Sequence, residues 1–165
     1  MSKQLGLDFR YINGDDARSR GIKIYQDFGG GLGVLDFDAD GWPDLFAVQG
    51  NRDPRRLDPE IRDGLFRNEA GNRFVAVGDL ARISECEFGQ GVSIGDFNHD
   101  GFQDILIANI GQNRLFRNEG DGTFIDVTAE SGLVGEQWST SCVLADFNAD
   151  GLDDIFVTNY LHGDE

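Results

Sequence analysis

The chain has 165 residues, which is enough for one domain with a hydrophobic core. It has 30 acidic and 14 basic side chains, a formal net charge of -16, and 39 % of its residues are hydrophobic. Such an acidic surface disfavours nucleic acids and anionic membranes as partners, and the hydrophobic content is too high for a disordered acidic tail. No apolar run approaches the roughly 18 residues that span a bilayer, so we expect no membrane insertion.

The N-terminal region is predicted to supply one outer strand and its connection to the first repeat. Residues 7–12, LDFRYI, resemble the last strand of the repeats described below, and Phe9 takes the place of Phe74. Residues 1–14 contain no apolar stretch of the signal-peptide type. The chain therefore either stays in the cytosol or lacks its native start.

Three nine-residue segments then repeat without gaps. They are DFDADGWPD from Asp36, DFNHDGFQD from Asp96 and DFNADGLDD from Asp146. A second motif, LFRNE, begins at Leu65 and again at Leu115, 50 residues later, whereas the first two Asp segments are 60 residues apart. The ten extra residues fall in NRDPRRLDPEIRDG, residues 51–64, which is predicted to be a surface insertion.

Each repeat is predicted to form four short strands. Apolar runs of about five residues lie before and after the Asp segment, and LFRN and one further run follow, joined by turns that suit hairpins. The sequence therefore predicts an all-β fold, a partial β-propeller of about two and a half four-stranded blades with Asp-rich loops. The predicted units are an orphan outer strand with its connection in 1–26, blades in 27–85 and 86–135, and a truncated half-blade in 136–165.

The number of blades predicts open ends. Propellers usually close with about four to eight blades, so the chain is either a piece of a larger ring or assembles with its own copies. The outermost sheets would expose apolar faces and unpaired strand edges, which favour association. Self-association through these edges is therefore expected.

The spacing D-x-[DN]-x-D-G-x-x-D predicts a calcium site in each of the three repeats. Side chains at positions 1, 3 and 5 can converge while the Phe at position 2 points into the blade, and Gly at position 6 allows a positive φ. The position-7 carbonyl and the position-9 Asp complete an all-oxygen set, which suits Ca²⁺ better than Mg²⁺ or Zn²⁺. The predicted ligands are Asp36, Asp38, Asp40, Trp42 and Asp44; Asp96, Asn98, Asp100, Phe102 and Asp104; and Asp146, Asn148, Asp150, Leu152 and Asp154.

The spacing of these loops allows two other interpretations. An EF-hand needs Glu at position 12 between two helices, but that position holds Ala47, Ile107 and Val157. Alternatively the Asp-rich turns only cap strands, because Asp, Asn and Gly are ordinary turn residues. Three gapless copies with carboxylates at positions 1, 5 and 9, which would repel one another without a cation, favour metal binding.

The motif resembles the FG-GAP (VCBS-type) calcium repeat of integrin α-subunit propellers. The longer match, GGGLGVLDFDADGWPDLFAVQGN followed by LFRNE and DVTAESGL, is similar to bacterial relatives of cartilage acidic protein, which have an ASPIC/UnbV domain after their propeller. The resemblance covers residues 27–160 and implies Ca²⁺ at the matching Asp and Asn positions and an extracellular, periplasmic or cell-surface location. The 165 residues hold too few blades for that closed propeller and show no ASPIC/UnbV segment.

The sequence contains no evident catalytic set, because Ser, Cys and His candidates are few and scattered. We therefore predict a non-enzymatic, calcium-stabilised binding or adhesion scaffold for an unknown protein or glycan ligand. The alternative is a carbohydrate-binding or glycan-processing portion of a larger secreted enzyme, in which Trp42 and Trp138 would stack on a sugar. A catalytic carboxylate pair would then have to come from residues outside the calcium loops. These are Asp53, Asp58, Glu85 and Glu87.

Overall fold

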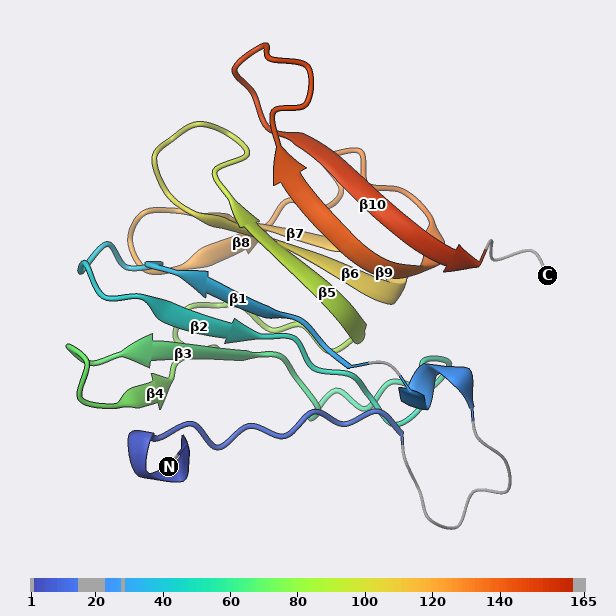
Figure 1. Cartoon of the computed structure of the whole chain (residues 1–165), viewed down its shortest axis with the longest axis horizontal. Coiled ribbons are helices and arrows are strands. Elements are labelled where there is room, and N and C mark those ends of the chain that lie inside the picture. The colour runs from blue at the N-terminus through green and yellow to red at the C-terminus, as the bar shows by residue number, and fades with distance from the viewer. Residues whose placement is uncertain (1, 15–22, 28, 162–165) are drawn as a thin grey trace.

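The computed structural model describes residues 2–14, 23–27 and 29–161, and nearly all of its regular structure is β-strand (Figure 1). Two short 3₁₀ helices, η1 (Ser2–Leu5) and η2 (Ile24–Asp27), lie in the N-terminal region. Neither of these described helices is long and apolar enough to cross a membrane. The all-β prediction is thus confirmed.

Four antiparallel strands form the first sheet, which we call blade 1. They are β1 (Leu32–Leu35), β2 (Asp44–Ala47), β3 (Gly64–Asn68) and β4 (Phe74–Ala76), in that spatial order. The first Asp loop joins β1 to β2, and the insertion joins β2 to β3. Both connections lie where the repeat spacing predicts them.

The second sheet combines two of the predicted units. Blade 2 consists of β5 (Phe88–Gly95), β6 (Asp104–Gln112), β7 (Arg114–Asn118) and β8 (Phe124–Asp126), and the half-blade consists of β9 (Glu136–Ala145) and β10 (Asp154–Leu161). Strand β9 also pairs with β6, from Ile110↔Trp138 to Gln112↔Glu136. The half-blade is therefore continuous with blade 2, because β6 and β9 are longer than the apolar runs that predict them.

Blade 1 and blade 2 pack face to face. Side chains alternate between the faces of a strand, so Ile105 and Ile107 of β6 point toward blade 1 while Leu106 points toward the half-blade. The first core contains Leu35, Phe37, Phe46, Val48, Leu65, Ile105, Ile107, Phe116 and Phe124. A second core on the other face of blade 2 contains Leu106, Leu115, Val127 and Leu144. Each blade thus covers the apolar face of its neighbour.

Residues 7–14 belong to neither sheet, although the sequence predicts an outer strand there. Hydrogen bonds attach this segment to both blades instead: the Tyr11 hydroxyl donates to the carbonyl oxygen of Gly89 in β5 at 2.9 Å, and the Ile12 N–H donates to Oε1 of Gln49, just after β2, at 2.7 Å. The Phe9 ring packs edge-on against Phe66, with 6.1 Å between the ring centroids. Apolar and side-chain contacts therefore replace the expected strand ladder.

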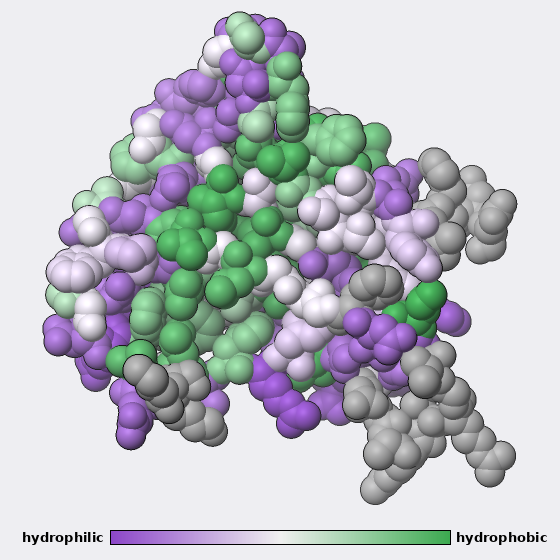
Figure 2. Space-filling model, viewed as in Figure 1, coloured by the Kyte–Doolittle hydropathy of each residue, from purple (hydrophilic) through white to green (hydrophobic). Residues whose placement is uncertain are grey.

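Uncovered apolar faces remain at both ends. On β1, Leu32 and Val34 are 64 % and 56 % exposed. Their counterparts in the next repeat, Val92 and Ile94, pack into the first core against blade 1. Figure 2 shows hydrophobic side chains gathered over β1 and β5 in the centre of the face in view.

The opposite end exposes the complementary face. Phe147 and Phe156 of the half-blade are 61 % and 57 % exposed. The corresponding side chains of blade 1, Phe37 and Phe46, are buried against blade 2. The exposed face of β1 therefore matches the face of β5 that packs on blade 1. The exposed face of the half-blade matches the face of blade 1 that packs on blade 2.

We propose that a second copy of the chain covers these end faces head to tail. Light scattering over a concentration series should show association, and Phe156→Lys should weaken it because a charge would be buried at the contact. Ile125→Lys, at an exposed apolar position on β8, is the matched control and should leave association unchanged. A cooperative monomer at high concentration would contradict the proposal.

Candidate metal centre

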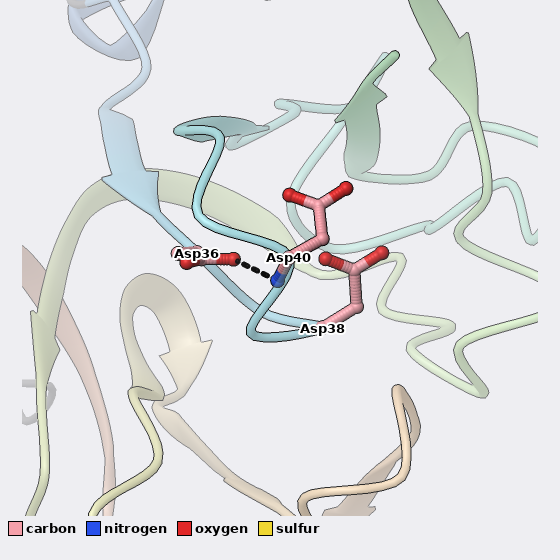
Figure 3. A group of neighbouring side chains, drawn as sticks. All are labelled: Asp36, Asp38 and Asp40. Atoms are coloured by element: carbon pink, nitrogen blue, oxygen red, sulfur yellow. Dashed lines mark hydrogen bonds between the residues drawn. The ribbon is translucent and has the colours of Figure 1, made fainter. Parts of the chain in front are cut away.

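The position-1 aspartate of the first loop organises the backbone around it. Oδ1 of Asp36 accepts the N–H of Asp40 at 3.0 Å and Oδ2 accepts the N–H of Gly41 at 2.9 Å. Figure 3 shows the first of these bonds. Oδ1 of Asp40 in turn accepts the N–H of Trp42 at 2.9 Å. Together these bonds curl the loop so that its carboxylates gather on one side.

The same bonds recur in the other two loops. Asp96 accepts from positions 5 and 6 at 3.0 and 2.8 Å, and Asp146 does so at 3.2 and 2.9 Å. The glycines at position 6 have φ of 87°, 93° and 87°, which confirms the predicted positive φ. All three loops therefore share one backbone conformation.

Position 4 also has a left-handed backbone, which the sequence does not reveal. Ala39, His99 and Ala149 have φ of 55°, 59° and 61°. A left-handed conformation costs a non-glycine residue about 1 kcal/mol or more. The three loops adopt it nonetheless, because it brings the N–H groups of positions 5 and 6 onto the position-1 carboxylate.

Three carboxylates converge in the first loop. Oxygens of Asp36, Asp38 and Asp40 all lie within 4.8 Å of one another (Figure 3). Oδ1 of Asp38 is buried and has no hydrogen-bond partner in the described chain, and burial raises the pKa of this carboxyl. A buried acceptor without a donor, next to two further carboxylates, fits a divalent cation.

The second and third loops have asparagine at position 3, so each has one carboxylate fewer. Nδ2 of Asn98 donates to Oδ2 of Asp100 at 2.8 Å, and Oδ1 of Asn148 accepts the N–H of Asp150 at 2.8 Å. An amide oxygen is also a Ca²⁺ ligand, but it brings no negative charge, so these two loops depend more on their remaining carboxylates. The position-7 residues donate their N–H groups to position 5, and the ligand role of their carbonyl groups stays a prediction.

All three position-9 aspartates accept backbone N–H groups, and Asp44 and Asp104 are buried whereas Asp154 is half-buried. Oδ2 of Asp44 accepts the N–H of Phe37 at 3.1 Å, and Oδ1 accepts the N–H of Asn68 in β3 at 2.7 Å. Asp104 makes the equivalent bonds in repeat 2. Burial is the main cause that raises the pKa of Asp44 and of Asp104 to about 6, and the other acids of each loop raise it further.

Sequence reasoning missed the residues that join the first loop to blade 2. Nδ2 of Asn118 donates to the Phe37 carbonyl oxygen at 2.8 Å, and Oε1 of Gln103 accepts the N–H of Asp36 at 2.8 Å. Asn118 is the last residue of the repeated LFRN motif, and its counterpart Asn68 donates to the Pro43 carbonyl oxygen. The repetition of Asn at the last position of the LFRN motif is the sequence signal that could have identified Asn118.

The position-2 phenylalanines follow the prediction only where a neighbouring blade covers them. Phe37 is 4 % exposed within the first core, and Phe97 packs against the second. Phe147 packs edge-on against Phe156 of β10, with 6.2 Å between the ring centroids, but is exposed because no further blade covers it. It lies on the uncovered face of the half-blade.

Comparison with known proteins places these loops in a family. The model of the FG-GAP-like repeat matches residues 36–107 and 96–157. The chain belongs to this family of repeats. It is also 33 % identical to integrin alpha-3 of Cricetulus griseus over 91 residues and to that of Mus musculus over 92 residues. These alignments cover 53 % and 54 % of the chain but 9 % of either integrin.

Calcium should stabilise the protein more at neutral than at acidic pH. Because the folded-state pKa of Asp44 and Asp104 is raised from 3.8 to about 6, the ion-free fold binds protons more tightly than the unfolded chain. Its free energy of unfolding should therefore fall as pH rises through about 6. Calcium needs the ionised carboxylates, so its stabilising effect should be larger at about pH 7 than at about pH 5. Thermal unfolding with EDTA and with calcium at both pH values checks this, and an equal shift at both would contradict it.

Proposed function

We propose that the chain is a calcium-binding propeller repeat module that acts as a non-enzymatic binding or adhesion scaffold outside the cytosol. The observation that supports this most is the first Asp loop, where three carboxylates converge around a buried oxygen without a donor. Membership in the FG-GAP-like repeat family and similarity to part of integrin alpha-3 support the scaffold role. The finer resemblance to bacterial ASPIC/UnbV propellers remains a prediction.

The chain's own residues prepare each proposed site. Position 1 fixes the loop backbone, positions 3 and 5 supply the exposed oxygens, and position 9 anchors the loop to its blade. A bound Ca²⁺ would neutralise these carboxylates, which repel one another in the ion-free loop, and would cross-link them. The fold would then gain the free energy of ion binding.

The location of the three loops fits a binding rim. They connect β1 to β2, β5 to β6 and β9 to β10, and Figure 1 shows them in succession at the left, the upper left and the top of the molecule. Loops at one end of a rigid β-scaffold are a common location of binding sites. We infer that a protein or glycan ligand would be recognised on this rim.

The glycan alternative has one supporting observation. Trp42 is 43 % exposed beside the first loop. Trp138 packs against Tyr160 instead, with 5.2 Å between the ring centroids. A melting shift that depends on added sugar, with quenched tryptophan fluorescence, would favour this alternative.

The carboxylates considered for catalysis already have structural partners. Asp53 pairs with Lys23, Asp58 with Arg52 and Glu87 with Arg114. Glu85 is 3 % exposed. Their geometry therefore favours the scaffold over glycan processing.

Calcium titration of EDTA-stripped protein tests the proposal. Isothermal titration should give one site for each of the three loops, with dissociation constants of about 10⁻⁴–10⁻³ M or tighter. Asp100→Asn keeps an acceptor for the N–H of Phe102 but removes a carboxylate, so it should remove one site and lose stability chiefly when calcium is present. Glu130→Gln, at an exposed position outside the loops, is the control. Absence of binding heat, or an equal loss of stability with and without calcium, would contradict the proposal.

A further inference from the structure

Two acids outside the calcium loops meet at the junction between blade 1 and blade 2. Asp63 ends the insertion just before β3, and Glu85 lies in the segment that leads into β5. The Asp63 N–H donates to the Glu85 carbonyl oxygen at 3.1 Å, so the two residues lie side by side, and the Glu85 carboxylate raises the pKa of Asp63. Glu85 is 3 % exposed.

In each of the two carboxyl groups, one oxygen accepts hydrogen bonds from the protein and the other oxygen accepts none from the described residues. Oδ1 of Asp63 accepts the N–H of Gln49 at 2.6 Å. Oε1 of Glu85 accepts from the N–H of Glu87 at 3.0 Å and from Nδ2 of Asn109 at 3.2 Å. Oδ2 of Asp63 and Oε2 of Glu85 are buried, and neither has a hydrogen-bond partner within the described ranges. One proton between these two oxygens would satisfy both.

The neighbouring repeat shows what this position normally holds. Asp63 corresponds to Asn113, because each lies two residues before the repeated LFRN motif. Oδ1 of Asn113 accepts the N–H of Asn109 at 2.9 Å, as Oδ1 of Asp63 accepts that of Gln49. An amide also has a donor on its second polar atom, whereas a carboxyl has one only when protonated. Asp63 therefore stands where the fold uses a neutral side chain.

Positive charge near the pair is engaged elsewhere. Arg114 of β7 pairs with Glu87 at 2.9 Å and with Asp126 at 3.3 Å. It lowers the pKa of Glu85, but Glu87 acts in the opposite direction. Burial is the largest cause that raises the pKa of Glu85, and that of Asp63 is raised well above 3.8.

The remaining neighbours include one further cation, Arg82, which lines the same pocket as Glu85 but makes no ion pair with either acid in the described part of the chain. From the N-terminal segment, Tyr11 faces the pair as a neutral phenol, and burial raises its pKa. Cys86 follows Glu85, and burial together with Glu85 raises the pKa of its thiol. Arg62 precedes Asp63 but pairs with Asp79 at 3.4 Å. Oδ2 of Asp63 and Oε2 of Glu85 are therefore candidate hydrogen-bond partners for each other.

We propose that Asp63 is a protonated carboxylic acid at neutral pH and that its Oδ2 donates this proton to Oε2 of Glu85. The shared proton ties the insertion to the segment that leads into blade 2, next to the bond from Nδ2 of Asn51 to the Cys86 carbonyl oxygen at 3.0 Å. Loss of the proton at alkaline pH leaves two buried negative charges in contact, so the insertion separates from this segment. We call the hydrogen bond between the Asp63 and Glu85 carboxyl groups the clasp; it is present when Asp63 is protonated and is lost when Asp63 ionises.

The pH dependence of unfolding in EDTA tests the clasp. Because burial raises the pKa of Asp63 well above 3.8 in the folded state, the clasp stabilises the fold fully below about pH 3.8, and this stabilisation is lost as pH rises from there through the raised pKa. In that range the folding equilibrium constant of the wild type should fall by up to about tenfold per pH unit more steeply than that of Asp63→Asn. Asp63→Asn supplies a permanent N–H donor and should remain as stable as the wild type at about pH 7. Glu130→Gln should keep the wild-type profile.

Carboxyl ¹³C NMR gives the direct readout. The Asp63 signal should stay in its protonated position through about pH 7 and should be absent in Asp63→Asn. Glu85→Gln is the second variant should the first fail to fold, and it too should abolish the wild-type slope. Titration of Asp63 near its ordinary pKa of 3.8 would overturn the proposal. So would a wild-type slope in both variants, or a further calcium ion lost on Asp63→Asn, which would make the pair a cation site.

Discussion

A single aspartate carboxylate that accepts two backbone N–H groups determines the form of each loop. With both oxygens of Asp36, Asp96 or Asp146 held in this way, position 4 is forced into a left-handed backbone and positions 3 and 5 turn outward. The loop therefore gathers the oxygens of positions 3 and 5 on one side by its own backbone bonds. Repulsion among these oxygens is the cost of the arrangement, and a divalent cation is the species that offsets it.

The loops are also connected to the blade interface. Asp44 joins the start of its loop to β3, while Asn118 and Gln103 reach from blade 2 to the backbone of the first loop. A change in the first loop is thus transmitted to the packing of blade 1 on blade 2 through hydrogen bonds to buried groups. We infer that ion binding and blade packing stabilise one another.

Much of this structure could be predicted because the pattern occurs three times. Features shared by the copies belong to the repeat, and features found in one copy, such as the insertion, belong to that copy alone. The blades, the positive φ of Gly41 and its counterparts, and the site of the insertion all follow from the pattern. Features without a repeat signal were missed. Ala39 has no intrinsic preference for its conformation, the pairing of β6 with β9 depends on strand length, and the contact of Asp63 with Glu85 joins the insertion, which has no counterpart in the other repeats, to the segment before β5.

Acidic groups serve two purposes in this chain, and they differ in what neutralises them. At the rim the carboxylates are partly open to solvent and suit calcium, whereas at the blade junction a buried pair suits a proton. The central claim is that the rim loops bind calcium, and anomalous diffraction from crystals grown with calcium tests it most directly. The account predicts one calcium peak in each of the three loops, about 2.3–2.6 Å from oxygens of positions 1, 3, 5 and 9. Loops that hold only water at saturating calcium would contradict it.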